Sequence, residues 1–312
     1  MNRIHRTAYK NMNKTLITTL ACLLLSLTGW AQTAPEAYRL YDSKGNPVTY
    51  EKMMKDLTQQ DVVFVGEMHN CVISHWLEVR ILKTLHQRHG NTLAVGMEML
   101  EADNQIIIDE YQKGQITAER FEDEMRLWPN HSTDYEPLVD YACEQGLPLV
   151  ATNVPRRYAN AVKNHGLAFL DSLSDEAKRY LPPLPIPYQQ NEQTNEGFGL
   201  MALLGKSKGS NPEWLSQSQA VKDATMAWNI ARYFNDGQQQ AKGGVRHFVH
   251  FNGNYHTDSG EGIITYLKHY APKLTLKTIY SVRQEDITAL EEDYLGKADY
   301  YICVPSDMVT SY

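Results

Sequence analysis

Short runs of β-branched and aromatic residues alternate along this chain with longer stretches of helical periodicity. Six runs are typical of buried strands: Asp61–Glu67, Thr92–Met99, Leu147–Val154, Val245–Asn252, Leu274–Val282 and Asp299–Val304. Each is bounded by Gly, Asn, Pro or a charged residue, as strand ends usually are. The alternation predicts an α/β fold with a mostly parallel β-sheet and helices on both faces.

One helix is predicted over residues 72–89. Gly90-Asn91 follows it, and a glycine at this position commonly ends a helix. The apolar side chains expected to face the sheet are Val72, Trp76, Val79, Leu82 and Leu85.

The interval 156–236 interrupts the alternation, because it is long, poor in strand patterns and contains the proline-rich stretch 182–187. A structureless loop of this length is uncommon in a compact domain. We therefore expect an inserted helical subdomain over 156–236, ending in a helix over 214–234. The α/β domain would then comprise residues 32–155 and 237–312.

The N-terminal segment has the pattern of a cleavable secretory signal. Lys14 precedes an apolar stretch from Leu16 to Leu27, and Gly29-Trp-Ala31 follows it. We expect residues 1–31 to be removed and the mature chain to be exported to the periplasm or cell envelope. Cys22 lies inside the apolar stretch, which argues against a lipid anchor.

The negative net charge argues against a nucleic-acid partner. The formal net charge is −7, and loss of residues 1–31 removes four basic residues and no acid, which gives −11. Nucleic-acid phosphates require a basic surface instead. The remaining cysteines, Cys71, Cys143 and Cys303, have neither the spacing nor the even number typical of a disulfide framework or zinc site.

Polar residues follow four of the predicted strands. They are Glu67 and His69 after the first, Glu98 at the end of the second, Asn153 and Arg156 after the third, and His256 after the fourth. The carboxyl ends of parallel strands meet at one edge of a sheet, where α/β proteins usually bind ligands. The sequence therefore predicts one crevice lined by these side chains.

Each of these residues also has a structural interpretation. Glu98 lies in an apolar strand, so it needs a partner whether or not it belongs to a site. His256 is as well suited to capping a loop as to binding a ligand, and His75 is expected to line a helix and pair with Glu78. HExxH, P-loop and GxSxG motifs are absent.

Five blocks in order resemble the ChaN family, the haem-binding uptake branch of a superfamily that includes Tiki proteases, TraB and erythromycin esterase. The blocks are Gly66-Glu-x-His69 with His75, the Glu98 strand, Ala151-Thr-Asn-Val-Pro-Arg156, Gln219-x-x-x-Asp223-x-x-Met226-Ala227, and Gly253-x-x-His256. The resemblance implies a haem-binding protein of iron acquisition that acts with an outer-membrane uptake system. It also implies a homodimer that holds haem between its subunits. Many members are lipoproteins, and this chain departs from them in lacking a lipidation cysteine.

The same resemblance implies a set of haem contacts. A tyrosine is the axial ligand in the family, and Tyr158 is the matching candidate here, with His256 as the alternative. A phenolate oxygen is a hard donor that suits ferric iron. Arg156 and Arg157 would pair with the propionates. Further contacts are expected from His69, His75, Glu98, Asn153, Asp223 and Met226.

The competing hypothesis is a hydrolase of the Tiki or erythromycin-esterase type. Glu67 and His69 would be catalytic, either as a base with its orienting partner or together with Glu98 and His256 as ligands of a divalent metal. The haem-binding interpretation is preferred, because it explains the Asn-Val-Pro-Arg block and the late histidine block.

Overall fold

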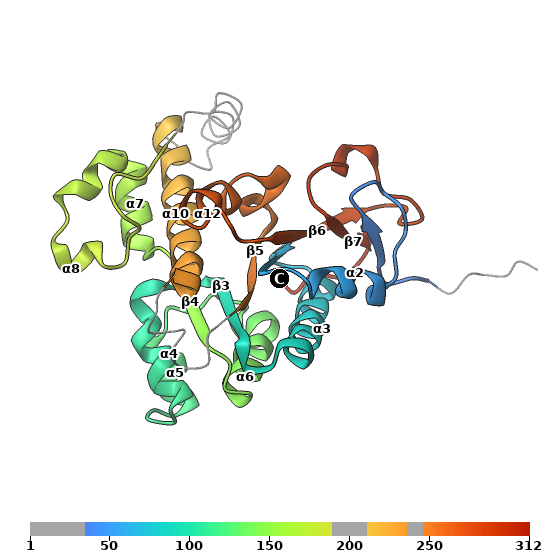
Figure 1. Cartoon of the computed structure of the whole chain (residues 1–312), viewed down its shortest axis with the longest axis horizontal. Coiled ribbons are helices and arrows are strands. Elements are labelled where there is room, and N and C mark those ends of the chain that lie inside the picture. The colour runs from blue at the N-terminus through green and yellow to red at the C-terminus, as the bar shows by residue number, and fades with distance from the viewer. Residues whose placement is uncertain (1–34, 189–210, 236–245) are drawn as a thin grey trace, which may run out of the picture. The chain divides into compact units, whose positions relative to one another are not determined.

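The computed structural model describes residues 35–188, 211–235 and 246–312. The chain divides into two compact units, Met1–Glu36 and Ala37–Tyr312, and the second contains every element described below (Figure 1). The predicted secretory signal at 1–31 lies outside the described residues.

Within the described residues, seven strands form one sheet in the order β1-β7-β6-β2-β5-β3-β4. The strands are β1 (Arg39–Asp42), β2 (Val62–Glu67), β3 (Leu93–Glu101), β4 (Leu149–Asn153), β5 (His247–Gly253), β6 (Leu276–Gln284) and β7 (Tyr300–Pro305). All neighbours pair in parallel except β1 and β7, which are antiparallel. The predicted mostly parallel sheet is therefore confirmed.

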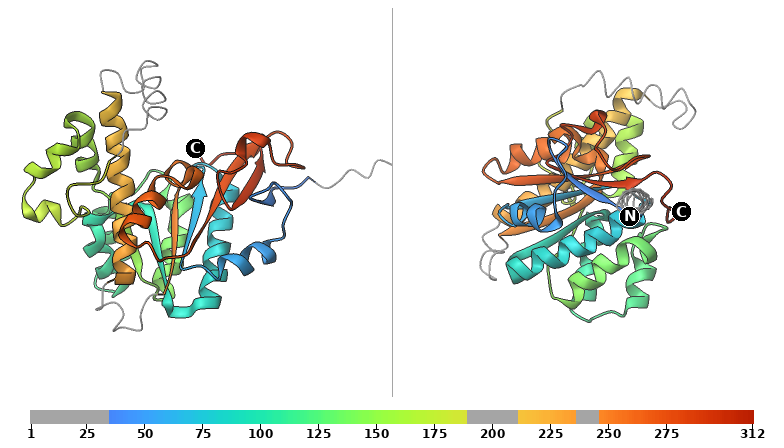
Figure 2. Two further views of the ribbon diagram at one scale, coloured as in Figure 1. Left: turned by 45° about the horizontal axis from the view of Figure 1, so that its top comes forward. Right: turned by 90° about the vertical axis from the view of Figure 1, so that its right-hand side faces the viewer.

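Helices cover both faces of this sheet (Figure 2). The α-helices are α2 (Tyr50–Leu57), α3 (Val72–His89), α4 (Gln105–Gln112), α5 (Ala118–Glu124), α6 (Glu136–Glu144), α7 (Arg156–His165), α8 (Asp175–Lys178), α10 (Pro212–Asn235) and α12 (Ile263–Tyr270). Shorter 3-10 or π segments are η1 (Gly90–Thr92), η2 (Ala102–Asn104), η3 (His131–Tyr135), η4 (Leu167–Ser172), η5 (Asn254–His256), η6 (Asp258–Gly260) and η7 (Glu292–Tyr294).

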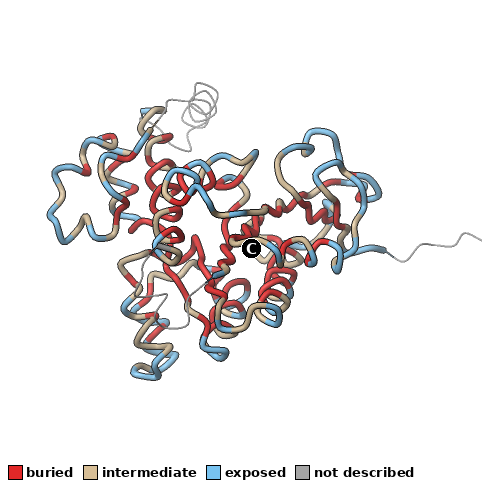
Figure 3. The backbone as a smooth tube through the Cα atoms, viewed as in Figure 1, coloured by how far each residue is buried: buried red, intermediate tan, exposed pale blue. Residues whose placement is uncertain are grey.

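Strand β2 shows how the sheet separates two apolar cores. Successive side chains of a strand point to opposite faces. Val63 and Val65 pack into the cluster that also contains the buried side chains of α3 and α6, whereas Val62 and Phe64 pack with those of α7, α10 and α12. Figure 3 shows burial concentrated in the sheet and in the helix sides that face it. Because both faces are covered, β2 needs an uninterrupted apolar run.

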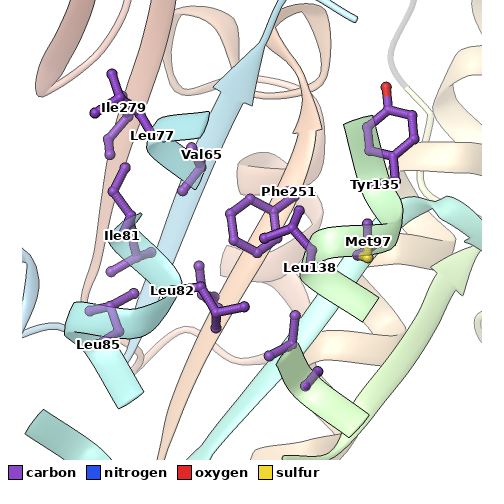
Figure 4. Close-up of a cluster of buried hydrophobic side chains, with 14 of the residues drawn as sticks. Val65, Leu77, Ile81, Leu82, Leu85, Met97, Tyr135, Leu138, Phe251 and Ile279 are labelled. Carbon is purple, nitrogen blue, oxygen red and sulfur yellow. The ribbon is translucent and has the colours of Figure 1, made fainter. Parts of the chain in front are cut away.

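Helix α3 has the predicted bounds, but one side chain of its predicted apolar set lies off the buried face. Gly90, with φ +56°, ends it as expected, since this conformation suits glycine. Leu82 and Leu85 are buried as predicted, together with Leu77 and Ile81 (Figure 4), whereas Trp76 is half exposed. The prediction for Trp76 was wrong because the buried side of α3 also carries polar residues, among them His75 and Glu78.

Helices α7, α8 and α10 with segment η4 fall in the interval between β4 and β5, and the described part of that interval contains no strand. Helix α10 packs against α7, α12 and β4. The division of the chain into an α/β domain and an inserted helical subdomain stays a prediction. The cysteines Cys71, Cys143 and Cys303 are free thiols.

Candidate functional site

The four strands whose ends carry the predicted site residues are adjacent in the sheet, in the order β2, β5, β3, β4. Pairing of β2 with β5 sets Glu67 opposite Gly253. Pairing of β3 with β4 sets Glu101 opposite Asn153, after a register shift that begins at Met97. The sheet therefore delivers polar residues that are distant in sequence to one edge.

Glu67 and His69 form a hydrogen-bonded pair at the end of β2. The Nδ1–H of His69 donates to Oε1 of Glu67 at 2.6 Å, and the hydroxyl of Tyr135 donates to the same oxygen at 2.7 Å. Glu67 is buried, whereas the His69 side chain is 33% exposed and packs edge-on against Trp128. Glu67 thus fixes the orientation of the imidazole through its Nδ1.

The charges around these two residues shift both pKa values. Burial alone would lower the pKa of His69, but the hydrogen bond and charge of Glu67, with the charge of Glu98, outweigh it and raise that pKa. Burial alone would raise the pKa of Glu67, yet its hydrogen bond to His69 and the charge of His75 lower it well below the usual range. The pair is therefore suited to an ionised carboxylate beside a histidine that readily holds a proton.

A second histidine is held between two carboxylates. Nδ1 of His256 lies 2.5 Å from Oδ1 of Asp223 on α10, and its Nε2 lies 3.0 Å from Oε1 of Glu98 on β3. The backbone N–H of Gly253 donates to the other Glu98 oxygen at 2.8 Å. All three side chains are buried, so each polar contact replaces water that the groups have lost.

These contacts and the burial of the three groups shift the pKa values of His256, Glu98 and Asp223. Burial alone would lower the pKa of His256, but the charges of Glu98 and Asp223 together raise it to about 10. Burial alone would raise the pKa of Glu98, but the charge and hydrogen bond of His256 lower it to about 2. Burial raises the pKa of Asp223 in spite of the same histidine.

Gly253 has no side chain, so the Glu67–His69 pair can lie close to the Glu98–His256 pair. A Cβ atom at this position would lie 2.8 Å from Nε2 of His69 and 3.5 Å from Oε2 of Glu98. The Nδ1 of each imidazole is therefore bound by a carboxylate, whereas Nε2 of His256 faces Glu98 and Nε2 of His69 lies beside Gly253. This arrangement fixes the tautomer of a histidine that acts as a metal ligand or as a base.

A cavity of about 630 Å³ opens beside these groups. Its lining residues are His69, Glu98, Glu101, Leu127, Trp128, Pro129, Asn153, Val154, Arg156, Ala159, Gln219, Lys222, Tyr255 and His256. Apolar and aromatic side chains form part of the wall, the acids and imidazoles form another part, and Arg156 and Lys222 add positive charge. The volume lies within the range of small-molecule and cofactor sites, roughly 300–1,000 Å³.

Three arginines and two acids form a network at one side of the cavity. Nε of Arg126 donates to Glu101 at 3.0 Å, and Arg156 donates to Glu101 from both its backbone N–H and its Nε. Asp103 accepts from Arg126 and from Arg157. The guanidinium of Arg156 is thus anchored through Nε, while its side chain stays 58% exposed.

The profile of the family described as "Haem-binding uptake, Tiki superfamily, ChaN" matches residues 53–267. The chain belongs to this family. The resemblance predicted from five sequence blocks is therefore confirmed.

Two solved structures are similar to this ChaN-family chain, and the first supports its fold. The structure described as "Cofacial heme binding to ChaN of Campylobacter jejuni" superposes with a TM-score of 0.63 at 17% identity, over 88% of this chain and 97% of that one. A mutant erythromycin esterase in an open conformation gives a TM-score of 0.47 at 12% identity, over 88% of this chain and 98% of that one.

A curated relative, Protein RETICULATA-RELATED 5, chloroplastic, of Arabidopsis thaliana, is 24% identical over 238 residues. The match covers 71% of the ChaN-family chain and 31% of that relative, so this chain spans less than a third of the relative's length.

The residues predicted for the site fall into three positions. Those that line the cavity are His69, Glu98, Asn153, Arg156 and His256. Glu67 and Asp223 lie behind the two histidines and bind them, and His75 lies deeper still, 3.3 Å from Glu67. Tyr158 and Met226 are not among the lining residues.

Local packing explains why Tyr158 and Met226 do not line the cavity. Tyr158 lies on α7, partly buried against the α10 side of the molecule, with the Arg157 guanidinium 4.4 Å from its ring centre and hydrogen-bonded to its hydroxyl. Met226 is completely buried in the same apolar cluster. Its neighbour on α10, Asp223, faces His256 instead.

Several residues of this ChaN-family site were not predicted from the sequence. Trp128 and Tyr135 flank His69, and Asn130 donates to the backbone oxygen of His69 at 3.0 Å. They come from the connection between α5 and α6, which contains the π-helical turn η3. Only its aromatic and polar composition, Trp-Pro-Asn-His, marks this stretch in the sequence. Tyr255 and Lys222, also unpredicted, line the cavity as well.

Proposed function

We propose that this chain is an exported haem-binding protein of haem or iron acquisition, and that haem occupies the cavity at the carboxyl ends of β2, β5, β3 and β4. Membership of the ChaN family supports a haem ligand. The Campylobacter jejuni neighbour is described as a heme-binding ChaN, and it covers 88% of this chain.

The observation that carries this proposal is the chemistry of the cavity wall. A porphyrin needs an apolar surface for its ring and cations for its two propionates. Leu127, Trp128 and Val154 supply the apolar surface, and Arg156 and Lys222 lie at the same cavity. An arginine anchored through Nε can still offer its outer N–H groups to a carboxylate.

We propose two candidates for the axial ligand. Tyr158 is a hard oxygen donor that suits ferric iron, and it lies two residues beyond Arg156, which lines the cavity. Its hydroxyl would have to leave the Arg157 hydrogen bond. His256 faces the cavity directly, but its Nε2 would have to leave Glu98.

The remaining predicted contacts would support the haem at different depths. His69 and Asn153 lie at the cavity wall, and Glu98 and Asp223 position His256. His75 and Met226 would act only through the residues that they pack against.

We also propose that the loaded protein is a homodimer located in the periplasm or cell envelope, and that it exchanges haem with an outer-membrane uptake system. The description of the neighbour as a cofacial heme complex supports a paired arrangement. The N-terminal pattern at 1–31 supports export. Within the described residues, none of the helices has the length and apolar character needed to cross a membrane.

Titration of the purified mature chain with hemin tests the proposal. We expect a saturable Soret band, which Tyr158→Phe shifts or weakens if the phenolate is the ligand and which His256→Gln changes if the imidazole is. Tyr312→Phe serves as the control, because this tyrosine lies exposed at the C-terminus. Absence of saturable binding refutes the function, whereas unchanged spectra in both ligand variants refute only the ligands.

A hydrolase is the second candidate, and one observation favours it. His69 and His256 each have a carboxylate on Nδ1, and Nε2 of His256 faces Glu98, which suits a divalent metal or a general base. In this case Glu67 and His69 would be the catalytic residues. Metal content and peptide or ester hydrolysis, measured before and after chelation, test it. Activity that follows the metal and disappears in Glu67→Gln would support the enzyme.

A further inference from the structure

A second group of metal-ligating side chains lies behind the cavity, and none of its three members lines that cavity. Glu67 comes from the end of β2, and His75 and Glu78 come from the first two turns of α3. All three are buried, and one potential ligand atom from each lies within 4.8 Å of the other two. The sheet and α3 therefore bring two carboxylates and an imidazole together away from solvent.

Both ring nitrogens of His75 face oxygen atoms. Its Nε2 lies 3.2 Å from the backbone oxygen of His69, which can only accept, and 3.6 Å from Oδ2 of Asp134. The proton of Nε2 is thus used in a bond to a carbonyl, as in many metal-binding histidines. Nδ1 forms a hydrogen bond with Oε2 of Glu78 at 3.1 Å and lies 3.3 Å from Oε2 of Glu67, so a cation bound here would take the place of the Nδ1 proton.

Two carboxylate oxygens of this group have no hydrogen-bond donor among the described residues. They are Oε2 of Glu67 and Oε1 of Glu78, and both are inaccessible to solvent. The other Glu67 oxygen is satisfied by His69 and Tyr135. Buried carboxylate oxygens normally have a donor or a cation, because the loss of water is otherwise uncompensated.

We propose that Glu67, His75 and Glu78 bind a divalent transition-metal cation such as Zn²⁺, Mn²⁺ or Co²⁺. Two carboxylates and a neutral imidazole carry two negative charges, which one divalent cation neutralises. Nitrogen and carboxylate oxygen together suit these ions. Separations of 3.1 and 3.3 Å between Nδ1 and the two oxygens resemble the edges of a metal coordination shell with bonds of about 2.1 Å.

The surrounding residues have the contacts expected of a supporting shell. Asn130 donates to Oδ2 of Asp134 at 2.7 Å, and Ser311 donates to the same oxygen at 2.6 Å. The backbone N–H of Ser311 also donates to the backbone oxygen of Asn70 at 3.1 Å, just before α3. The C-terminal segment thus holds Asp134 in place beside His75. The three proposed ligands are buried, whereas the cavity is lined by partly exposed side chains.

Co²⁺ is the probe for this site, because its visible absorption reports coordination by nitrogen and oxygen. The hydrolase alternative would place a metal at His69, Glu98 and His256, so the titration uses a Glu98→Gln/His256→Gln background after chelation. We expect one equivalent of Co²⁺ to bind in that background. Addition of Glu78→Gln should weaken the binding at least 100-fold, and Glu78→Asp should give an intermediate loss. Circular dichroism checks that each variant folds.

Anomalous diffraction from crystals of the unmutated chain grown with Co²⁺ supplies a second measurement that needs no variant. We expect a peak between Glu67, His75 and Glu78. A peak only at His69, Glu98 and His256, or an affinity for Co²⁺ that Glu78→Gln leaves unchanged in the double-variant background, overturns the proposal. Failure of the unmutated chain to bind Co²⁺ overturns it as well.

Discussion

Nε2 of His256 lies 3.0 Å from Oε1 of Glu98, and both side chains are buried although they come from different elements, the segment η5 and strand β3. An ion pair of this kind persists in the interior only when its remaining polar atoms also have partners. Asp223 and the backbone N–H of Gly253 are those partners. The pair is therefore the electrostatic centre of the site.

The pair should make stability depend on pH in a defined direction. His256 has a pKa of about 10, above its ordinary 6.5, so its contribution is complete below pH 6.5 and is lost as the pH rises through 10. Glu98 has a pKa of about 2, below its ordinary 4.5, so its contribution is complete above pH 4.5 and is lost as the pH falls through 2.

Urea denaturation of the unmutated chain and of His256→Gln measures this dependence. We expect the difference in unfolding free energy to shrink by at least about 1.4 kcal/mol, the equivalent of one pKa unit, as the pH rises from 6.5 to 10. A difference that stays constant over this range would show that His256 is uncharged in the folded chain.

Much of the fold could be predicted from the sequence, because strands covered on both faces need continuous apolar runs. The run in β2 is an example. Strand β1 was missed, since it has only four residues, Arg-Leu-Tyr-Asp, with charged ends and an edge position. The register shift between Met97 and Glu101 was also not predictable, because residue order does not show where a strand bends.

For the site, the sequence predicted which strand ends converge but not how deep each side chain lies. Polar residues after parallel strands must share one edge, and that rule brought Glu67, Glu98 and His256 together. Whether a residue of a helix faces the cavity depends on helix rotation, so Tyr158 and Met226 could not be placed. Trp128 follows no strand, and it reaches His69 through an irregular connection that has no simple sequence pattern.

Helix α3 allows a direct test of the corrected buried face. Ile81 is completely buried, and Ile81→Ala should lower the unfolding free energy by about 2–5 kcal/mol because it leaves a cavity. Trp76 is half exposed, with a ring contact to Tyr38, so Trp76→Ala should cost no more than about 1 kcal/mol. Chemical denaturation compares the two variants. A larger loss for Trp76→Ala would restore the face first predicted.

Asp223 should act on His256 through charge. Its carboxylate lies 2.5 Å from Nδ1, so Asp223→Asn keeps the size of the side chain but removes a negative charge. We expect the pKa of His256 to fall by about one to three pH units, as measured by NMR titration of the imidazole. Met226→Leu, three residues along the same helix, is the control and should leave that pKa unchanged. Equal pKa values in all three proteins would contradict the positioning role.

Gly253 offers a test that removes no functional group. Its backbone, with φ −58° and ψ 142°, is open to any residue, so alanine there introduces no backbone strain. The new Cβ would lie 2.8 Å from Nε2 of His69, which is closer than such contacts allow, and the ring must turn away from Glu98. We expect Gly253→Ala to destabilise the fold by about 1–3 kcal/mol.

Replacement of His69 should relieve this clash, which makes a double-mutant cycle decisive. In a His69→Ala background the Cβ of Ala at position 253 has no imidazole to meet, so the second substitution should cost much less than it does alone. A coupling of about 1 kcal/mol or more in the unfolding free energy would confirm that His69 is held against Gly253. Additive effects would mean that the imidazole already lies elsewhere. In that case the position of His69 beside Gly253, which the hydrolase alternative uses, would have to be withdrawn.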